Sequence, residues 1–349
     1  MNVKCYTTKD IKWNEQIKKL PIEKQDIYYM REYALLCEHD GKSEAVLFSV
    51  EQGGNIGIYV FMKNKIKQWH GVDDYYDIET PYGYGGPIIG KDDQQFEEIF
   101  ESLFLQYCRE NNIIAEFVRF HPLFKNHTIF KNNIEVLENR TTVSLDLTLS
   151  EEEIWMNQIG KQNRNTIRKA IKSGLKVEET RDDAEFRKLY ENTMNKVGAE
   201  QFYYFDDSYY SRLWNNQEIV LLQVKQIDEQ AGNNEVIAAA FFMGCGEYFH
   251  YHLAGSKKEA LKLAPNNLLL WEAIRYGKRK GYKKMHFGGG LTNEETDSLF
   301  QFKKKFSKDT NIFYIGKRVH NNEVYSALVN EWKRRTGRKS SILLCYREG

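Results

Sequence analysis

The sequence lacks the features that mark membrane-spanning, secreted or nucleic-acid-coating proteins. Proline is scarce, with 5 residues among 349, and no proline- or serine-rich linker is visible. No apolar run approaches the roughly 18–20 residues that span a bilayer, and the first residues contain no apolar signal core. Basic and acidic residues nearly balance, at 50 and 49. We therefore expect a cytoplasmic protein with no transmembrane segment, whose basic regions, if any, are local.

Cysteine and histidine also provide no obvious metal site. The five cysteines are dispersed and include no Cys-x-x-Cys pair: Cys5, Cys37, Cys108, Cys245 and Cys345. Such a set is typical of reduced thiols. His250 and His252 would share one face of a strand, but no third ligand lies near them in sequence. We therefore predict no metal.

The chain does have enough apolar residues to form packed cores. Hydrophobic residues make up 41% and aromatic residues 14%. A chain of 349 residues is long enough for about two domains on the usual length prior. Disorder over most of the chain is therefore not expected.

A helix followed directly by a strand occurs once in each half of the chain. Apolar residues recur at helical spacing in 96–108, and strand 113–120 follows. Helix 267–280 is likewise followed by strand 283–287. In the second half, 219–227, 235–244 and 247–253 are expected to form an antiparallel meander before that helix. We predict α/β domains with mixed sheets, divided near Leu145 into domains 1–145 and 146–349.

Three local predictions concern shorter segments. Tyr33–Cys37 is expected to be a strand joined by a turn to the strand Ala45–Val50, and Ser341–Cys345 is expected to be the last strand. Ser150 and Glu153 have the spacing of a capping box and should open a helix.

The stretch from Lys283 to Ser307 contains the most suggestive local pattern. A short strand ends in three glycines, Gly288–Gly290, which allow positive φ angles and close approach of a ligand. Acidic residues follow, and then a helix that contains Phe300, Phe302 and Phe306 together with three consecutive lysines, Lys303–Lys305. The pattern indicates either a ligand site or a tight turn with a charged helix face.

The element order is that of a GNAT acyltransferase domain, and it occurs twice. Several stretches also resemble the Fem family of tandem-GNAT enzymes. They are YGYGGPII (82–89), VRFHPLF (118–124), IGKQNRNTIRKAIKSGLKVEE (159–179), HLAGS (252–256), the glycine-ended segment 265–290 and LFQFKKKF (299–306). Together they cover most of the chain in the family's order.

The resemblance implies an enzyme that transfers an acyl or aminoacyl group. Fem enzymes add amino acids to peptidoglycan precursors, and relatives that use acyl-CoA occur with envelope polysaccharide pathways. The family's Phe-Lys pair corresponds to Phe302-Lys303, whose lysine would stabilise the oxyanion formed when an amine attacks the acyl group. Such an ammonium can contribute on the order of 3 kcal/mol to the transition state.

The resemblance also implies sites for the two substrates. Gly288 and Gly289 would lie beside the acyl donor. Of the basic stripe Lys161, Arg164, Arg168 and Lys172, Arg164 and Arg168 are the candidates for binding a phosphate-rich ligand, whereas Lys172 is expected to belong to an ordinary charged face. In the first half, Tyr82, Tyr84, Arg119 and His121 would line the acceptor site. His250, His252 and Asp297 are candidates for removing a proton from the attacking amine.

Two departures leave the donor open between aminoacyl-tRNA and acyl-CoA. Many Fem enzymes carry a long helical arm, for which the stretch between Lys172 and Asp206 is too short. GNAT domains that use acetyl-CoA usually have a glycine-rich phosphate loop before the long helix, where this chain has KLAPNN (262–267).

We expect direct attack by the amine without a covalent enzyme intermediate. The acceptor would be a peptidoglycan peptide or an amino sugar of the cell envelope, with possible contact to tRNA or, peripherally, to a lipid-linked substrate. Two alternatives remain: an acyl-CoA-dependent N-acyltransferase for surface-polysaccharide amino sugars, and a non-catalytic GNAT-fold binding protein.

Overall fold

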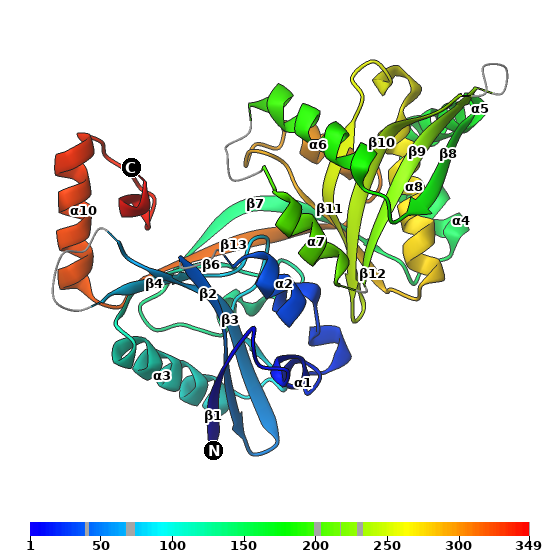
Figure 1. Cartoon of the computed structure of the whole chain (residues 1–349). Coiled ribbons are helices and arrows are strands. Elements are labelled where there is room, and N and C mark those ends of the chain that lie inside the picture. Colours follow the sequence, from blue (N-terminus) through cyan, green and yellow to red (C-terminus); the bar gives the residue numbers. More distant parts are fainter. Residues whose placement is uncertain (39–41, 68–73, 199–203, 217, 229–232, 349) are drawn as a thin grey trace. The chain divides into compact units, whose positions relative to one another are not determined.

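The computed structural model describes the chain except for residues 39–41, 68–73, 199–203, 217, 229–232 and 349 (Figure 1). The chain divides into two compact units: unit 1 comprises residues 1–139 and 312–349, and unit 2 comprises residues 140–311. Each unit has the predicted α/β character, with helices packed on a mixed sheet. None of the described helices is long and apolar enough to cross a membrane.

Unit 1 is built on a sheet with strand order β1-β2-β3-β4-β6-β13. Its strands are β1 (Asn2–Thr7), β2 (Ser43–Gln52), β3 (Asn55–Lys65), β4 (Tyr76–Glu79), β5 (Ile88–Ile89), which pairs with β3, and β6 (Ile113–Arg119). Strand β13 (Thr310–Val319) begins in unit 2 and completes this sheet by pairing antiparallel with β6.

The helices of unit 1 cover this sheet with aromatic and aliphatic side chains. They are α1 (Trp13–Ile17), α2 (Arg31–Leu36), α3 (Gln94–Glu110) and α10 (Asn322–Thr336), with short 3-10 turns η1 (Ile22–Lys24), η2 (Ile27–Tyr29), η3 (Asn126–Thr128) and η7 (Cys345–Arg347). Phe96, Phe100 and Phe104 of α3 pack on the inward residues of β2 and β3, at the helical spacing that the sequence predicts.

Unit 2 has the strand order β8-β9-β10-β11-β12-β7. Its strands are β7 (Glu135–Asp146), which begins in unit 1, β8 (Leu175–Thr180), β9 (Ile219–Asp228), β10 (Asn233–Cys245), β11 (Tyr248–Ser256) and β12 (Lys284–Gly289). The antiparallel run β9-β10-β11 is the predicted meander.

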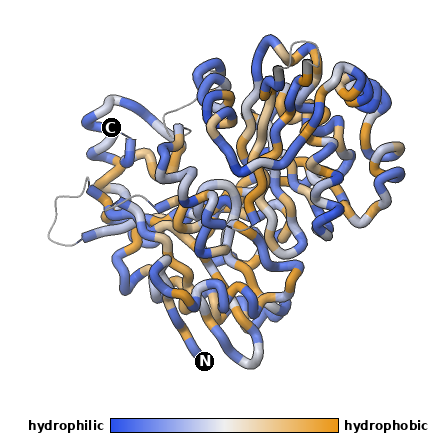
Figure 2. The backbone as a smooth tube through the Cα atoms, turned by 45° about the vertical axis from the view of Figure 1, so that its right-hand side comes forward, coloured by the Kyte–Doolittle hydropathy of each residue, from blue (hydrophilic) through white to orange (hydrophobic). Residues whose placement is uncertain are grey.

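Helices cover both faces of the unit 2 sheet. They are α4 (Glu151–Glu153), followed by a π-helical turn (Ile154–Gln158), α5 (Lys161–Lys172), α6 (Ala184–Val197), α7 (Asp207–Trp214), η6 (Leu261–Leu263), α8 (Pro265–Arg279) and α9 (Ser298–Lys304). Phe241 of β10 contacts Phe186 of α6 and Trp214 of α7, whereas Phe242 belongs to the core under α8. Adjacent residues of a strand point to opposite faces, so α6 and α7 lie on one face and α8 on the other. In Figure 2 the outer helices and loops are mostly blue (hydrophilic), and the orange (hydrophobic) stretches lie mainly in the interior of each unit.

One pair of neighbouring strands in each unit is parallel and is joined by a long helix. β4 leads through α3 to β6, and β11 leads through α8 to β12. Parallel neighbours need such a crossover. The two helix–strand pairs recognised in the sequence therefore occupy equivalent places in their units.

Three sequence predictions differ from the structure, and one is confirmed. The segment predicted as strand Tyr33–Cys37 lies mostly in helix α2, and Ser341–Cys345 forms no strand but packs under α10. Residues 312–349, placed in the second domain (146–349), group instead with unit 1, because β13 pairs with β6. The capping box of Ser150 and Glu153 is present.

Candidate functional site

The parallel strands β11 and β12 of unit 2 separate at their C-terminal ends. They pair at Tyr248–Lys284, Phe249–Met285 and His250–His286, and within these two fully described strands the pairing stops there. The register of β11 against β10 shifts at His252, and that of β12 against β7 shifts at Phe287. Bulges of this kind bend a strand and re-aim its side chains. The opening between the two strands is therefore flanked by His252 on one side and the glycine turn on the other.

The three glycines at the C-terminal end of β12, Gly288–Gly290, are required by the local geometry. Gly288 has a φ of +78°, a value that side-chain-bearing residues rarely adopt. A Cβ on Gly290 would lie 2.3 Å from Oδ1 of Asp297. The turn is thus shaped by close packing around its backbone, as well as by freedom of φ.

Lys303 of α9 is buried against this turn. Lys303 is only 7% exposed, and its Nζ donates a hydrogen bond of 2.6 Å to the carbonyl oxygen of Gly289. Nζ also lies 5.7 Å from the ring centre of Tyr251. Burial lowers the pKa of Lys303 to about 7; nearby Asp297 acts to raise it and Arg140 to lower it. Lys303 is therefore a buried amine that changes charge near neutral pH.

Asp297 holds the turn and the start of α9 together. Its carboxylate accepts hydrogen bonds from the N–H groups of Leu291 and Thr292, both at 3.0 Å, and from that of Phe300 at 2.9 Å. Burial acts to raise the pKa of Asp297, but these backbone hydrogen bonds outweigh it and the pKa is lowered. This arrangement is that of a helix N-cap, which fixes where Lys303 lies.

The two histidines of β11 lie away from Lys303, on the α7 side. Nε2 of His252 and the hydroxyl of Tyr209 on α7 are 2.8 Å apart. Burial lowers the pKa of His252 to about 3, with a smaller contribution from His250, so the ring is neutral at neutral pH. The His250 ring lies 5.6 Å from that of His286 on β12, and both residues are buried.

The arginines of α5 have different roles. Arg164 donates from Nη1 to the carbonyl oxygens of Trp155, Met156 and Ile159, at 3.2, 3.1 and 2.5 Å. It therefore caps the π-helical turn rather than pointing outward. Arg168 is exposed and lies 5.3 Å from the ring centre of Trp155.

A cavity of about 880 Å³ lies beside α6 and the segment that leads to α8. Its apolar lining includes Leu189, Ile237 and Leu263. Its cationic lining consists of Lys196, Lys257, Lys258 and Lys262, of which Lys257 pairs with Glu235. The cavity can therefore accommodate a ligand with both apolar and anionic parts.

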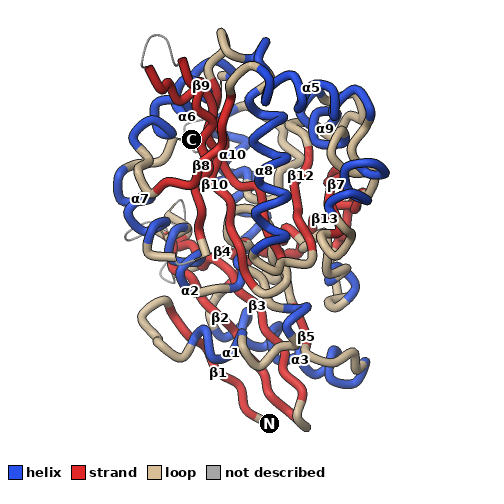
Figure 3. Tube along the Cα trace, turned by 90° about the vertical axis from the view of Figure 1, so that its right-hand side faces the viewer, coloured by secondary structure: helices blue, strands red, loops and turns tan. Residues whose placement is uncertain are grey.

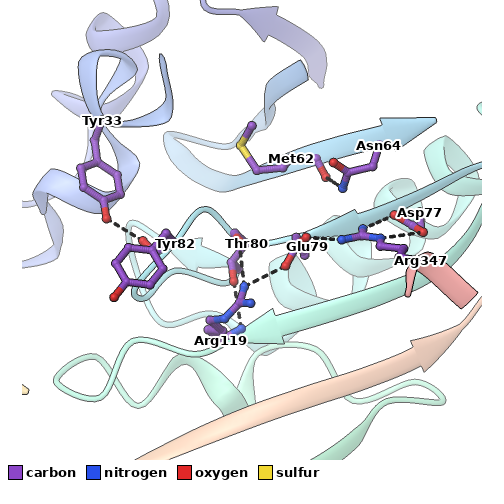
Figure 4. Close-up of polar contacts among 9 residues, drawn as sticks. All are labelled: Tyr33, Met62, Asn64, Asp77, Glu79, Thr80, Tyr82, Arg119 and Arg347. Carbon is purple, nitrogen blue, oxygen red and sulfur yellow. Dashed lines mark hydrogen bonds and ion pairs between the residues drawn. The ribbon is translucent and has the colours of Figure 1, made fainter. Parts of the chain in front are cut away.

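In unit 1, Arg119 is held by groups of the protein itself (Figure 4). Its Nη1 donates to Oε2 of Glu79 at 3.0 Å and to the carbonyl oxygen of Thr80 at 3.2 Å. Arg347 bridges Glu79 and Asp77. Burial acts to raise the pKa of Glu79, but the two arginines more than offset this and lower it.

Tyr84 and His121 lie together in unit 1, with ring centres 6.2 Å apart. His121 is buried, stacks on Phe124 at 3.8 Å, and has Nε2 3.3 Å from Oδ2 of Asp26. The carbonyl oxygen of Tyr82 accepts a 2.6 Å hydrogen bond from the hydroxyl of Tyr33. The structure therefore brings Tyr84 and His121 together.

Sequence reasoning missed Arg140, Tyr209 and Tyr251. Arg140 donates from Nη1 to the carbonyl oxygens of Gly290 and Leu291, at 2.8 and 3.2 Å, and so holds the turn opposite Asp297. Its partners are about 150 residues away, so no local pattern points to it. Tyr251 stands between two histidines that were singled out, but a tyrosine on a strand has no specific signal.

Comparison with known proteins identifies the fold. Residues 161–304 match the model of the acetyltransferase (GNAT) domain. The crystal structure of FemX is similar over 94% of this chain and 99% of its own, with a TM-score of 0.72 and 15% identity.

Two further structures share the fold. The C-terminal domain of a putative lysylphosphatidylglycerol synthetase from Agrobacterium fabrum has a TM-score of 0.54 at 14% identity, covering 89% of this chain and 93% of its own. L-PGS from Bacillus licheniformis has a TM-score of 0.50 at 15% identity, covering 88% and 92%. No curated protein sequence matched.

These likenesses confirm the predicted fold class and, at the level of fold, the resemblance to Fem enzymes. The matched domain contains the separated strands, the glycine turn and Lys303, and it supports an acyl- or aminoacyl-transferase. Residues 161–304 therefore match the GNAT acetyltransferase domain, within a chain that has the fold of FemX.

Proposed function

We propose that this chain is a Fem-type enzyme that transfers an acyl or aminoacyl group to an amine of a cell-envelope precursor. The observation that carries the proposal is the burial of Lys303 against the glycine turn, at the opening between β11 and β12. A lysine is seldom buried without an ionic partner unless its charge has a use. The chain shares its fold with FemX and with a domain of a putative lysylphosphatidylglycerol synthetase. This likeness is consistent with a substrate from the cell envelope.

The reaction is a direct displacement at the acyl carbon. The acceptor nitrogen forms a bond to that carbon, and the bond to the donor oxygen of an aminoacyl ester, or to the sulfur of a thioester, breaks. Negative charge develops on the carbonyl oxygen. The ammonium of Lys303 has three protons to donate, and only one is needed for Gly289. The others can stabilise the oxyanion in a site that excludes water.

The acceptor amine must lose a proton during the reaction. We propose that His252 accepts it. Its neutral ring can accept a proton and pass it toward Tyr209. A pKa of about 3 makes it a weak base, so we expect the amine to arrive already neutral and His252 to accept the proton late in the reaction. His250, two residues before His252 on β11, is the second candidate for the proton acceptor. Asp297 is proposed to act by positioning α9.

In unit 1, Tyr84 and His121 are proposed to contact the acceptor, with Tyr82 and Arg119 at the margin. Arg119 lies between Glu79 and Thr80, so it can orient this segment even where it does not touch the acceptor (Figure 4). We place the reaction in the cytoplasm, where both classes of donor are made.

The donor is proposed to carry phosphate groups near α8. The lysines of the cavity beside the segment leading to α8 can bind phosphate although the glycine-rich loop is missing. Both aminoacyl-tRNA and acyl-CoA have such groups. The stretch from Lys172 to Asp206 contains β8 and α6 and leaves no length for a long helical arm. This favours an acyl-CoA-dependent N-acyltransferase of amino sugars as the second candidate.

The test compares Lys303→Ala and Lys303→Arg with Lys304→Ala. Lys304 is the exposed neighbour on the same helix, so its substitution changes the charge but not the buried site. Turnover is measured by intact mass of an amino-sugar or peptide acceptor after incubation with charged tRNA or with acyl-CoAs. Lys303→Ala should lower kcat by about 100-fold or more, whereas Lys304→Ala should not.

Thermal shift with the same ligands separates the enzyme from a binding protein. Stabilisation by one donor class, with turnover that needs Lys303, supports the proposal and identifies the donor. Stabilisation without turnover would favour the non-catalytic binding protein. Full turnover in Lys303→Ala would refute the oxyanion role.

A further inference from the structure

One helix of unit 2 has an acid-free surface that the proposed reaction does not use. Helix α5 has the sequence KQNRNTIRKAIK and contains five cations and no carboxylate. Asn163, Ile167 and Ala170 face the core. The residues that project away from the core are exposed, and we call the cations among them the basic face: Lys161, Arg168, Lys169 and Lys172.

The basic face is not neutralised within the described part of the chain. None of its four cations forms an ion pair with a described carboxylate, although Arg168 donates to Oδ1 of Asn165 at 3.2 Å. The fifth cation, Arg164, is turned inward onto three carbonyl oxygens. The helix therefore presents its charge to the outside.

The C-terminal end of α9 extends this surface. The carbonyl oxygen of Lys305 accepts hydrogen bonds from the backbone N–H of Gly160 and from Nδ2 of Asn163, at 3.3 and 3.1 Å. Helices α5 and α9 lie side by side, as Figure 3 shows. Lys304, Lys305 and Lys308 are exposed and lie next to the basic face.

Carboxylates also occur in the segment that precedes α5 and in the one that follows α9. Glu152 of α4 and Asp309 are exposed. Glu151 pairs with Arg275, and Glu153 is used in the capping box. These groups reduce the positive charge at the margin but do not interrupt the row of cations on α5.

Two large apolar side chains flank the cations. Met156 is 54% exposed and Ile171 is 51% exposed. Ile171 lies about one helical turn beyond Arg168 on α5, and the backbone carbonyl of Met156 accepts a hydrogen bond from Arg164, so both residues lie near the cations of this helix. Trp155, under Arg168, completes the flank.

We propose that the basic face and its apolar flank dock the enzyme on an anionic lipid bilayer. Lysines near an anionic membrane each contribute favourable electrostatic energy, and adjacent apolar side chains insert below the headgroups. An RNA backbone would also attract the lysines, but it offers no apolar layer for Met156 and Ile171. The docking surface goes beyond the proposed reaction and does not depend on it.

The experiment measures co-sedimentation of the full chain with vesicles. Vesicles of phosphatidylcholine alone are compared with vesicles of equal parts phosphatidylcholine and phosphatidylglycerol. The wild type should bind only the anionic vesicles and be released by salt. A variant with Lys161, Arg168, Lys169 and Lys172 all changed to Gln should bind at least ~10-fold more weakly.

A charge-matched control comes from unit 1. Lys333, Arg334, Arg338 and Lys339 are exposed on and after α10, and changing these four to Gln removes the same charge from another surface. Binding by this control should equal that of the wild type. Equal weakening by both variants would refute the proposal, because it would show dependence on net charge alone.

The apolar flank is tested separately. Met156→Ser and Ile171→Ser together should weaken binding to anionic vesicles by a few-fold, whereas Ile342→Ser, at a 55% exposed site in unit 1, should not. Anisotropy with a labelled RNA hairpin provides the competing outcome. Binding of RNA through the basic face with no binding to anionic vesicles would refute membrane docking.

Discussion

Each unit contains one pair of parallel strands joined by a long helix, but the two pairs differ at their C-terminal ends. In unit 1 the pair β4 and β6 stays closed: the N–H of Thr80 donates to the carbonyl of Phe117 at 3.2 Å, and that of Gly85 donates to Arg119 at 2.7 Å. In unit 2 the pair β11 and β12 opens after His250 and His286. The topology therefore does not decide whether such a pair makes a site.

The charged side chains follow the same difference. In unit 1, buried Glu116 is matched by Arg318, His320 and the hydroxyl of Tyr59, and Arg318 also pairs with Glu101. In unit 2, Lys303 has a backbone carbonyl as its hydrogen-bond partner and no ion pair with a described carboxylate. In this cluster of unit 1 each buried carboxylate faces a cation, whereas buried Lys303 faces a backbone carbonyl and is proposed to act on a ligand.

The largest expected effect concerns the closed charge cluster of unit 1. Glu116→Ala would leave Arg318 buried with only Glu101 as a counter-ion and should destabilise unit 1 by about 3–5 kcal/mol. The rates of amide hydrogen exchange in peptides from β6 and from β12 report the stability of unit 1 and unit 2 separately. Faster exchange confined to β6 is expected. Equal acceleration in β12 would show that the cluster is not specific to unit 1.

The second prediction concerns the pH dependence that the buried lysine gives to unit 2. The proposed oxyanion role requires protonated Lys303, whose pKa is lowered by burial from 10.5 to about 7. Its contribution is complete below this value and should fall about tenfold per pH unit above it.

Lys303→Arg is the control for this pH profile, because a guanidinium does not titrate in this range. The alkaline decline of kcat should be absent in that variant, whatever its absolute rate. An unchanged decline would assign it to another group.

Stability should show the opposite dependence. An unfolded lysine keeps its proton up to about pH 10.4, whereas folded Lys303 loses it near pH 7. The unfolded state therefore binds more protons across this interval, and the stability of wild type relative to Lys303→Met should rise with pH. Urea titrations at several pH values measure it, and a relative stability that is flat or falls would contradict the lowered pKa.

A smaller effect is expected from Gly290→Ala. The added Cβ would meet Oδ1 of Asp297 at 2.3 Å and displace the N-cap of α9. The loss should be about 1 kcal/mol of stability, with a larger fall in turnover because Lys303 moves with the helix. Gly160→Ala in the same unit meets no atom within 4 Å and has a φ of −57°, so it controls for the loss of a glycine without the steric contact.

The smallest effect is expected from Thr80→Val in unit 1. The Thr80 hydroxyl accepts the N–H of Arg119 at 3.0 Å. Its removal should cost about 1 kcal/mol and loosen the closed pair without creating a second active opening. Hydrogen exchange at Arg119 measures it. A gain of donor binding by unit 1 would show that closure alone separates the two pairs.

Local patterns predicted the elements but not their long-range partners. The apolar spacing of α3 and α8, and the capping box at Ser150, depend on neighbours within a few residues. Segment Tyr33–Cys37 was misassigned because a short apolar run does not distinguish helix from strand. Pairing of β13 with β6 joins residues about 200 apart, which no local signal records.

The candidate site divides in the same way. Lys303 was predicted from the Phe-Lys pair of the Fem resemblance, and the glycine turn from the run of three glycines. Tertiary packing determines three contacts that the sequence does not reveal. Lys303 donates to the carbonyl of Gly289, Arg140 donates to that of Gly290, and Arg164 donates to that of Trp155. Charge pattern alone made Arg164 and Arg168 look equivalent, and the structure distinguishes them.

The passage of β7 and β13 between the units makes unit 2 an insertion in unit 1. Its two ends lie close together, since Nδ2 of Asn311 donates to the hydroxyl of Ser144 at 2.9 Å. During synthesis, unit 2 is complete once Asn311 has left the ribosome, whereas unit 1 still awaits β13, with Arg318 for its buried carboxylates. The half of the protein that is made first is therefore the half that finishes folding last.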